Sequence, residues 1–363
     1  MLFNKKIAVV VPAYNEEKQI GMVIETMPAF VDRIVIINDC SKDSTADVIL
    51  RHMEQDHTNP VDVTPQSSAI QRTLHNEAEV ILHESEKKEL KYFPPCDIVQ
   101  ERHSRIVLIN QLKNSGNGVG IARGLKWTKD HQFDCAAVMD GDGQMDPAEL
   151  ESIVTPIVKD EVDYVKGNRL IHRSAWLVIP KIRYFGNSIL AILTKIASGY
   201  WRVSDTQCGF IALSLRAMQS LRIHQIYRRY GWPNDLLVKL NIAYCTLREV
   251  EIKPVYHIGE KSKMKIHKII PKISWLLLKS FFKRLWIKYL FRDFHPLFLL
   301  YNFSFILGLL LIPYIAKIIY LSIYGQSISF ETLAMFLFLS TAGFQSLFFA
   351  MFMDIQDNER LYK

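Results

Sequence analysis

Cysteine is scarce in this sequence, and no two cysteines stand in a short motif. The five cysteines are scattered, odd in number and without a Cys-x-x-Cys pair: Cys40, Cys96, Cys135, Cys208 and Cys245. Closely spaced pairs are the usual mark of structural zinc sites, and even numbers are typical of the disulfide frameworks of secreted domains. The cysteines therefore favour reduced thiols in the cytoplasm, and nothing in them indicates a zinc site.

A secretory signal is also missing from the start of the sequence. Lys5 and Lys6 lead directly into a short apolar run at residues 7–11. This run is too short and too strand-like for the apolar region of a signal peptide, and no small-residue cleavage site follows it. We therefore expect no export signal, in agreement with the reduced cysteines.

The spacing of a dinucleotide-binding glycine motif is absent as well. Gly116, Gly118, Gly120 and Gly124 form a cluster, but the third glycine of a G-x-G-x-x-G motif would fall on Ile121. A tight turn before a helix is one interpretation of this cluster. From its context we favour the other, in which the backbone at Gly118 approaches a bound nucleotide closely.

Two long stretches carry almost no charge. The chain has 363 residues, of which 49% are hydrophobic, and residues 296–323 and 330–353 are nearly free of charged side chains. Helices of this length and apolarity can cross a bilayer. A buried hairpin in a soluble domain is the alternative, but such helices usually keep a polar stripe. We predict an integral membrane protein with two spans within residues 294–354 and a cytoplasmic tail at 355–363.

Positive charge gathers immediately before the first of these stretches. The chain has a net charge of +7, and lysine and arginine recur through residues 261–293 among tryptophan, leucine and phenylalanine. This mixture predicts an amphipathic juxtamembrane segment on the cytoplasmic side that attracts anionic lipid headgroups. Nucleic acid is the competing partner, which the interleaved apolar bulk disfavours. A merely solvated basic face is the remaining alternative.

Short apolar runs alternate with segments of helical spacing through the first 260 residues. We expect strands at residues 7–12, 33–38, 106–110, 135–139, 163–166 and 246–251, and helices at 16–27, 44–53 and 184–198. Such alternation predicts an α/β domain over residues 1–260 with a mainly parallel sheet. Residues 55–105 break the pattern with four prolines and a Glu/Lys-rich patch. They are expected to form an insertion with a helix near residues 68–90.

Two carboxylates follow the apolar run at residues 135–139. Asp140 and Asp142 are separated by one glycine and followed by Gly143 and Gln144. Polar side chains at the carboxyl end of a parallel strand are where open α/β sheets bind ligands. Hard oxygen donors in this arrangement suit Mg²⁺ or Mn²⁺, which share their coordination with substrate phosphates. Surface turns often contain the same Asp-x-Asp pattern. The prediction of a metal site therefore depends on the position of Asp140 and Asp142 directly after an apolar strand.

Four segments, taken in order, resemble the signatures of family 2 glycosyltransferases. They are VVVPAYNEE at 9–17, VIINDCSKDST at 35–45, the glycine-rich residues 114–125 and VMDGDGQMDP at 138–147. The likeness is closest to dolichyl- and polyprenyl-phosphate mannose or glucose synthases. It implies a GT-A nucleotide-diphospho-sugar transferase fold, with a Rossmann-like sheet, followed by the membrane segments. It also implies metal-dependent, inverting transfer of a sugar from a UDP- or GDP-linked donor to undecaprenyl or dolichyl phosphate.

The resemblance assigns roles to the residues that match these motifs. It implies that Pro12, Tyr14 and Glu16 line the nucleotide pocket, that Asp39 meets the base or ribose, and that Asp140 also lies at the donor. The residues that match the metal-binding triplet are Asp140, Asp142 and Gln144. The catalytic candidates are Asp142, Arg169, which would face phosphate, Asp205, in the segment that closes over the sugar, and Asp235, at a position that is usually acidic. Residues 259–263, GEKSK, resemble a loop near the acceptor.

Three departures from the family pattern leave the base and the sugar of the donor open. Cys40 follows Asp39 where an Asp-Gly pair is expected, Asn117 stands where a lysine is common, and the insertion before Arg105 is longer than usual. None of them removes a metal ligand. Whether the chain forms a homo-oligomer is equally open.

Other acceptors and one other class of protein compete with this hypothesis. A polyprenyl phosphate is already ionised, whereas a diacylglycerol or polysaccharide hydroxyl would require Asp205 or Asp235 as a general base. Residues 225–230 weakly resemble the QxxRW signature of processive synthases, but they precede Asp235 instead of following it. A catalytically silent membrane scaffold that binds nucleotide sugars is the third alternative, and the intact Asp140 and Asp142 argue against it. We expect a cytoplasmic catalytic domain at an inner or plasma membrane.

Overall fold

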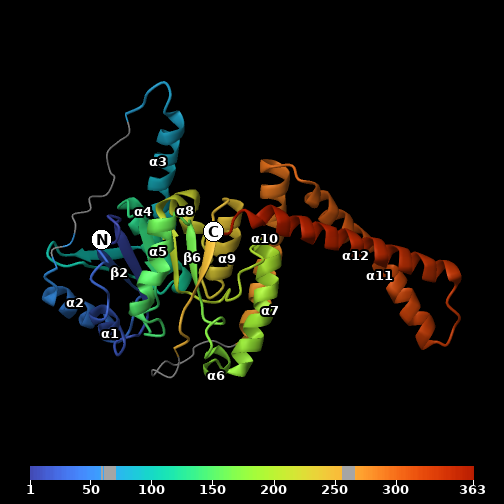
Figure 1. Ribbon diagram of the computed structural model, residues 1–363, viewed down its shortest axis with the longest axis horizontal. Helices are drawn as coiled ribbons and strands as arrows, with labels where there is room; N and C mark the ends of the chain where they lie inside the picture. Colours follow the sequence, from blue (N-terminus) through green and yellow to red (C-terminus); the bar gives the residue numbers. More distant parts are fainter. Residues whose placement is uncertain (59, 61–70, 256–265) are drawn as a thin grey trace.

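The computed structural model describes residues 1–58, 60, 71–255 and 266–363, and in it one mixed sheet runs through the N-terminal domain (Figure 1). The strand order is β3-β4-β2-β1-β5-β7-β6-β8. The strands are β1 (Ile7–Ala13), β2 (Arg33–Asn38), β3 (Cys96–Gln100), β4 (Ile106–Gln111), β5 (Cys135–Val138), β6 (Tyr164–Asn168), β7 (Ile211–Ser214) and β8 (Leu247–Glu251).

The centre of the sheet is parallel, as the apolar runs predict. Strands β4, β2, β1 and β5 are parallel neighbours, with Val10 of β1 opposite Val35 on one side and Val138 on the other. Every residue of β2 is buried, which is typical of strands covered by helices on both faces. The carboxyl ends of these four strands therefore meet at one edge, where ligands of open α/β sheets bind.

Two antiparallel strands were missed by the sequence interpretation. The four-residue strand β7 lies between β5 and β6 and is antiparallel to both, and β3 pairs antiparallel with β4 at the edge. β7 runs directly into α8 (Leu215–Ser220), so its apolar run is too short to be told from the start of a helix. β3 lies within the predicted insertion and is mostly exposed, so it lacks an apolar signal.

Helices cover both faces of the sheet. On one face α4 (Asn117–Asp130), α8 and α9 (Trp232–Ile242) pack over one half of the apolar core. On the other face lie α1 (Ile20–Glu25), α2 (Thr45–Gln55) and α5 (Leu150–Asp160). The expected helix at residues 16–27 is thus shorter than predicted. The connecting helices are η2 (Pro147–Glu149), η3 (Ile223–Gln225), α6 (Ala175–Val178) and α7 (Lys181–Ser198).

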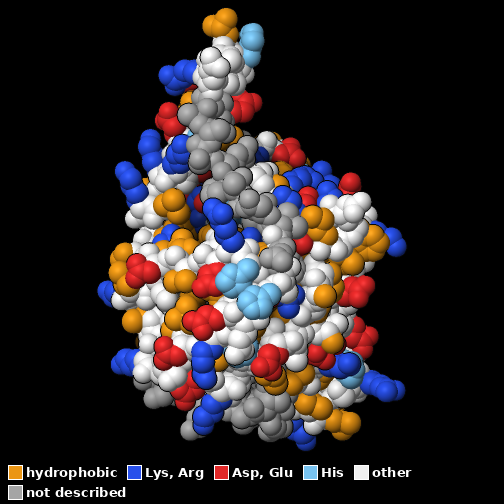
Figure 2. Space-filling model, turned by 90° about the vertical axis from the view of Figure 1, so that its left-hand side faces the viewer, with side chains coloured by type: hydrophobic (Ala, Val, Ile, Leu, Met, Phe, Trp, Pro, Cys, Tyr) orange, Lys and Arg blue, Asp and Glu red, His pale blue; other side chains and the backbone are white. Residues whose placement is uncertain are grey.

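The insertion contributes α3 (Glu77–Glu89), η1 (Leu90–Tyr92) and the edge strand β3. The predicted helix near residues 68–90 forms from Glu77 onward, and residues 68–70 lie outside the described residues. Glu89, at the end of α3, is buried, and its Oε1 lies within hydrogen-bond distance, 3.0 Å, of His224 Nδ1. α3 projects from the top of the domain, on the side away from α11 and α12 (Figure 1). Figure 2 shows that side chains of both charges are interspersed on the face of the molecule below it.

Residues 266–363 leave the sheet domain through α10 (Ile266–Trp286), which packs beside α7 and α9, and then through the π-helix η4 (Ile287–Arg292). α11 (Pro296–Ile323) and α12 (Phe330–Glu359) then project together from the domain (Figure 1). Both are long and apolar enough to cross a membrane, and only 6% and 11% of their most apolar windows is buried. A soluble core helix would instead be mostly buried.

The chain end returns to the sheet domain instead of standing apart from it. α12 continues to Glu359, beyond residue 354, where the second span was expected to end. Leu361 is 4% exposed and belongs to the core beneath α4 and α9. Tyr362 forms an isolated parallel bridge with Leu247 of β8, and the C-terminus lies near β6 and α9 in Figure 1.

Candidate active site

The Asp140–Asp142 pair lies at the carboxyl end of β5, the fourth of the central parallel strands. Asp140 comes two residues after Val138, where β5 ends, and Gly141 donates its N–H to the Pro12 carbonyl at 3.2 Å. Gly143 has a φ of +78°, a conformation that favours glycine and turns the chain back. The sequence prediction that these carboxylates follow a strand is therefore confirmed, and Pro12 lies beside them.

Negative charge accumulates around Asp140. Burial and then the neighbouring charges of Asp142 and Glu16 raise the pKa of Asp140 to about 7, although a hydrogen bond from Asn117 and the charge of Arg169 act in the opposite direction. A divalent cation would relieve this repulsion between carboxylates. The charge cluster and its oxygen donors therefore fit Mg²⁺ or Mn²⁺.

The protein supplies few ligands to such an ion. Within the described part of the chain, no group of three or more His, Cys, Asp or Glu side chains is placed to hold a metal. Gln144 donates its backbone N–H to Asp142 Oδ1 at 3.0 Å, which orients that carboxylate. An ion bound here would take its remaining ligands from water and substrate phosphates, as Mg²⁺ commonly does.

The loop that carries Tyr14 and Glu16 is fastened to the segment after β2. Asn15 has a φ of +55°, its N–H donates to Ser41 Oγ at 3.0 Å, and its Oδ1 accepts the Lys42 N–H at 2.9 Å. The Glu16 N–H donates to Thr45 Oγ1 at 2.9 Å. These bonds hold the predicted nucleotide-pocket residues next to the end of β2.

Asp39 is buried at the end of β2 and binds the glycine-rich loop. Its Oδ1 accepts the Ser115 N–H and its Oδ2 accepts the Gly116 N–H, each at 2.8 Å. Burial raises the pKa of Asp39, and these two hydrogen bonds offset part of that rise. The structure thus gives Asp39 a role that the sequence interpretation missed, and its contact with base or ribose stays a prediction.

Arg169 and Asp205 form a bidentate ion pair. Arg169 Nε lies 2.7 Å from Asp205 Oδ2, Nη2 lies 3.0 Å from Oδ1, and the Arg169 backbone N–H also donates to Oδ2 at 3.2 Å. Burial alone would raise the pKa of Asp205, but Arg169 and then Lys166 bring it below its usual value. A carboxylate held in this way is a poor general base, so the geometry assigns Asp205 to orienting Arg169.

Two further residues, which the sequence interpretation missed, support this pair from β6 and β8. Glu249 accepts the backbone N–H groups of Ser204 and Asp205 at 2.8 and 3.3 Å. Lys166 is fully buried and donates to the Cys208 carbonyl at 2.6 Å, and burial lowers the pKa of its ammonium group. A lysine inside an otherwise apolar strand was the available signal for this role.

Gly118 and Asp235 both contact the segment 227–229. A Cβ on Gly118 would lie 2.0 Å from the Tyr227 carbonyl oxygen, and the Gly118 N–H donates to the Arg228 carbonyl at 3.1 Å. The backbone at Gly118 is thus in close contact with the chain's own segment 227–228, and its approach to a nucleotide stays a prediction. Asp235 accepts the Tyr227 N–H at 2.9 Å and pairs with Lys239.

Asn234, the neighbour of Asp235, contacts the segment after Asp205. Its Oδ1 accepts a hydrogen bond from Gln207 at 3.2 Å, and its Nδ2 donates to Thr194 of α7 at 2.7 Å. Of the two neighbours Asn234 and Asp235, it is therefore Asn234 that contacts the segment predicted to close over the sugar. The predicted acceptor loop at residues 259–263 lies outside the described residues.

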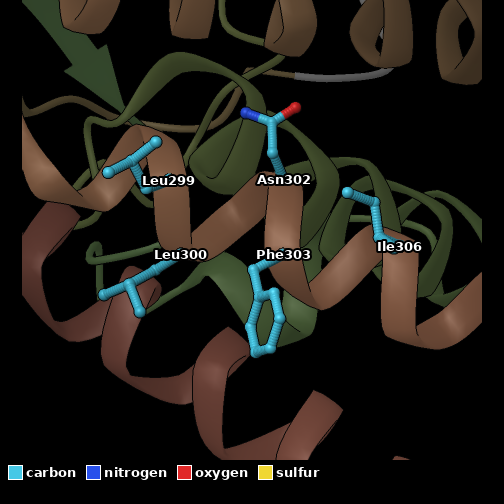
Figure 3. Close-up of a pocket in the computed structure, with 5 residues that line it drawn as sticks. All are labelled: Leu299, Leu300, Asn302, Phe303 and Ile306. Carbon is cyan, nitrogen blue, oxygen red and sulfur yellow. The ribbon is translucent and has the colours of Figure 1, made fainter.

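A hollow of about 400 Å³ lies on α11, well apart from these residues in the chain (Figure 3). Leu299, Leu300, Asn302, Phe303 and Ile306 line it. Asn302 donates its amide to the Phe298 carbonyl at 2.7 Å, and no charged or metal-binding side chain is present in this lining. This hollow is therefore no candidate for the chemistry, which needs the carboxylates of the sheet domain.

Known proteins are similar to this chain in sequence. Glycosyl transferase family 2 matches residues 8–74 and 95–222, and the unmatched residues 75–94 fall in the insertion. A UDP-N-acetylglucosamine–dolichyl-phosphate N-acetylglucosaminyltransferase of Methanococcus voltae is 26% identical over 70% of this chain and 87% of its own length. A dolichyl-phosphate beta-glucosyltransferase of Trichomonas vaginalis is 26% identical over 77% of this chain and 74% of its own length.

Among solved structures, glucosyl-3-phosphoglycerate synthase from Mycobacterium tuberculosis with Mn²⁺ and UDP-glucose is similar at a TM-score of 0.47. It is 18% identical, and the match covers 77% of this chain and 79% of that one. The resemblance to dolichyl- and polyprenyl-phosphate sugar synthases, predicted from the four ordered motifs, is confirmed by the curated relatives. This chain belongs to glycosyl transferase family 2.

Proposed function

We propose that this protein transfers a sugar from a UDP- or GDP-linked donor to a polyprenyl phosphate at a membrane surface. The observation that carries the proposal is the carboxylate pair Asp140 and Asp142 at the carboxyl edge of the central strands, in a chain that ends in an apolar hairpin. Names of the relatives support the acceptor, since both act on dolichyl phosphate. The catalytic domain would face the cytoplasm at an inner or plasma membrane.

Breaking the sugar–phosphate bond leaves negative charge on the departing nucleoside diphosphate. A Mg²⁺ or Mn²⁺ ion held by Asp140, Asp142 and Gln144 would stabilise that charge without a proton. Arg169 would add a positive charge, and Asp205 orients its guanidinium from one side. Pro12, near the end of β1, and Tyr14 and Glu16, on the loop that follows, would line the nucleotide pocket.

The state of the other carboxylates supports an acceptor that is already ionised. A hydroxyl acceptor, on a diacylglycerol or a polysaccharide, needs a general base within reach of its proton. Asp205 is paired with Arg169 and has a lowered pKa, and Asp235 is engaged by Lys239 and the Tyr227 N–H. A phosphate monoester is an anion at neutral pH and attacks without such a base.

The test is transfer of radiolabelled sugar from a panel of UDP- and GDP-sugars to undecaprenyl and dolichyl phosphate in detergent. We expect labelled lipid that depends on Mg²⁺ or Mn²⁺ and disappears with EDTA. Asp142→Ala should lower kcat by at least about 10²-fold, because it removes a ligand of the charge-stabilising ion. Asp146→Ala, in the same loop but outside the triplet, is the matched control. Full activity of Asp142→Ala would contradict the proposal, and donor hydrolysis without labelled lipid would contradict the acceptor.

A further inference from the structure

A buried ion pair joins the end of α12 to the sheet domain. Arg284 of α10 and Asp354 of α12 are both fully buried, and their two hydrogen bonds measure 2.7 and 2.8 Å. Arg284 also donates to the carbonyls of Ala197 and Ile196, in the last turn of α7, at 3.0 and 3.1 Å. One guanidinium thus fastens three helices together, with its donors satisfied as a buried charge requires.

The same region is built to admit the arginine closely. Gly199 follows α7 with a φ of +76°, and a Cβ there would lie 2.3 Å from Arg284 Nη1. Around it, Lys288 Nζ donates to Asn358 Oδ1 at 2.6 Å and to Asn241 Oδ1 of α9 at 3.2 Å. The end of α12 is therefore tied to α7, α9 and α10 by buried polar contacts.

The residues after this pair reach the connector 199–205, which runs from the end of α7 to Asp205. Trp201 Nε1 donates to Asp354 Oδ2 at 3.3 Å, and the Arg202 N–H donates to Tyr362 Oη at 2.9 Å. Glu359 pairs with the Arg202 guanidinium, which also lies 5.3 Å from the centre of the Tyr362 ring. The C-terminal residues 354–362 thus hold the connector along its first half.

The second half of the connector carries Asp205, the partner of Arg169. Glu249 of β8 holds the Ser204 and Asp205 N–H groups, and β8 is also the strand to which Tyr362 is bridged. Asp205 in turn holds Arg169 through three hydrogen bonds. A continuous set of contacts therefore runs from the end of the apolar hairpin to Arg169.

We propose that Asp354 and Tyr362 are positioning residues for the transfer reaction. By fixing Trp201 and Arg202 they set the course of the connector, and through Asp205 they set the orientation of Arg169. This inference rests on the proposed function, in which Arg169 faces the departing diphosphate. A guanidinium displaced by about 1 Å loses much of its catalytic effect without leaving the site, because orientation governs rate steeply.

The test is the double variant Trp201→Phe/Tyr362→Phe, which removes the Trp201–Asp354 and Arg202–Tyr362 hydrogen bonds, keeps an aromatic ring at each position and leaves the Arg284–Asp354 pair in place. We expect kcat for transfer per folded molecule to fall on the order of tenfold, while the Kd of UDP with Mn²⁺ changes less than about twofold. Hydrogen exchange of a peptide covering residues 202–210 should rise. The matched control is Tyr92→Phe/Trp275→Phe, at side chains that are 66% and 70% exposed, and it should behave as wild type.

Thermal unfolding separates positioning from a purely structural role. An unchanged kcat with a lowered Tm would overturn the proposal and leave the contacts as a structural staple. Unchanged exchange at residues 202–210 would overturn it as well, whatever the activity. Should the double variant not be recovered folded, Tyr362→Phe alone carries the same measurements. Failure of wild-type protein to label any lipid would instead overturn the proposed function, and the exchange experiment does not depend on that result.

Discussion

Substituting Asp205 by asparagine decides whether this carboxylate acts on substrate or only on Arg169. Asp205 is 1% exposed, and asparagine keeps its shape but removes the charge that faces Arg169 at 2.7 and 3.0 Å. Breaking a buried ion pair from one side costs about 3–5 kcal/mol. The Arg169 side chain keeps 23% exposure, and asparagine still accepts one hydrogen bond, so we expect a loss of about 2–3 kcal/mol in the free energy of unfolding.

The activity of this variant is best measured in a double-mutant cycle with Arg169→Ala. Loosening Arg169 should lower kcat by about 10- to 100-fold in Asp205→Asn. If Asp205 works only through Arg169, the double variant should be no slower than Arg169→Ala alone, since the interaction is already lost. A general base would contribute independently by about 10²- to 10⁴-fold. Additive losses in kcat would therefore refute the positioning role and restore Asp205 as a base.

Three further outcomes follow from the same structure. Cys40 has a φ of +58°, which costs an L-residue energy, so Cys40→Gly should raise the free energy of unfolding by about 0.5–1 kcal/mol in urea denaturation. Gly118→Ala should lower it by about 1–3 kcal/mol or more, because its Cβ would meet the Tyr227 carbonyl, whereas Gly186→Ala, with no atom within 4 Å, should not. The raised pKa of Asp140, about 7, means that protons compete with the metal below that pH. The Mn²⁺ concentration for half-maximal activity should thus increase as the pH falls from about 8 to about 6, and a pH-independent value would contradict this.

The central sheet could be predicted from the sequence because its strands are buried on both faces. The runs at residues 7–12 and 33–38 are almost wholly apolar, and they form β1 and β2 within one residue of the expected bounds. The position of Asp140 followed from the same logic, since a polar pair after a buried strand lies at the sheet edge. Burial on both sides is a local signal that needs no knowledge of distant residues.

The contact made by Gly118 could not be predicted, because it depends on a segment that lies far away in the sequence. Tyr227 comes 109 residues after Gly118 in the sequence, and its carbonyl occupies the space that a side chain at Gly118 would need. The same segment presents the N–H that Asp235 accepts. A glycine next to a bound nucleotide and a glycine next to the chain's own backbone have the same sequence pattern, so the pattern could not separate them.

The acidic residues of the site are separated by what surrounds each carboxylate, and motif position alone does not do this. Asp39 and Glu249 each accept two backbone N–H groups, so their charge holds loops in place. Asp205 is neutralised by Arg169, which lowers its pKa despite burial. At Asp140 the shift has the opposite direction, because burial and then the neighbouring carboxylate of Asp142 raise the pKa. Two neighbouring carboxylates repel each other unless a proton or a cation lies between them, and a cation would also bind the diphosphate of a donor. The crowding of charge at Asp140 and Asp142 therefore supports the prediction that these two carboxylates hold the metal, whereas Asp205 and Glu249 already have their partners within the chain.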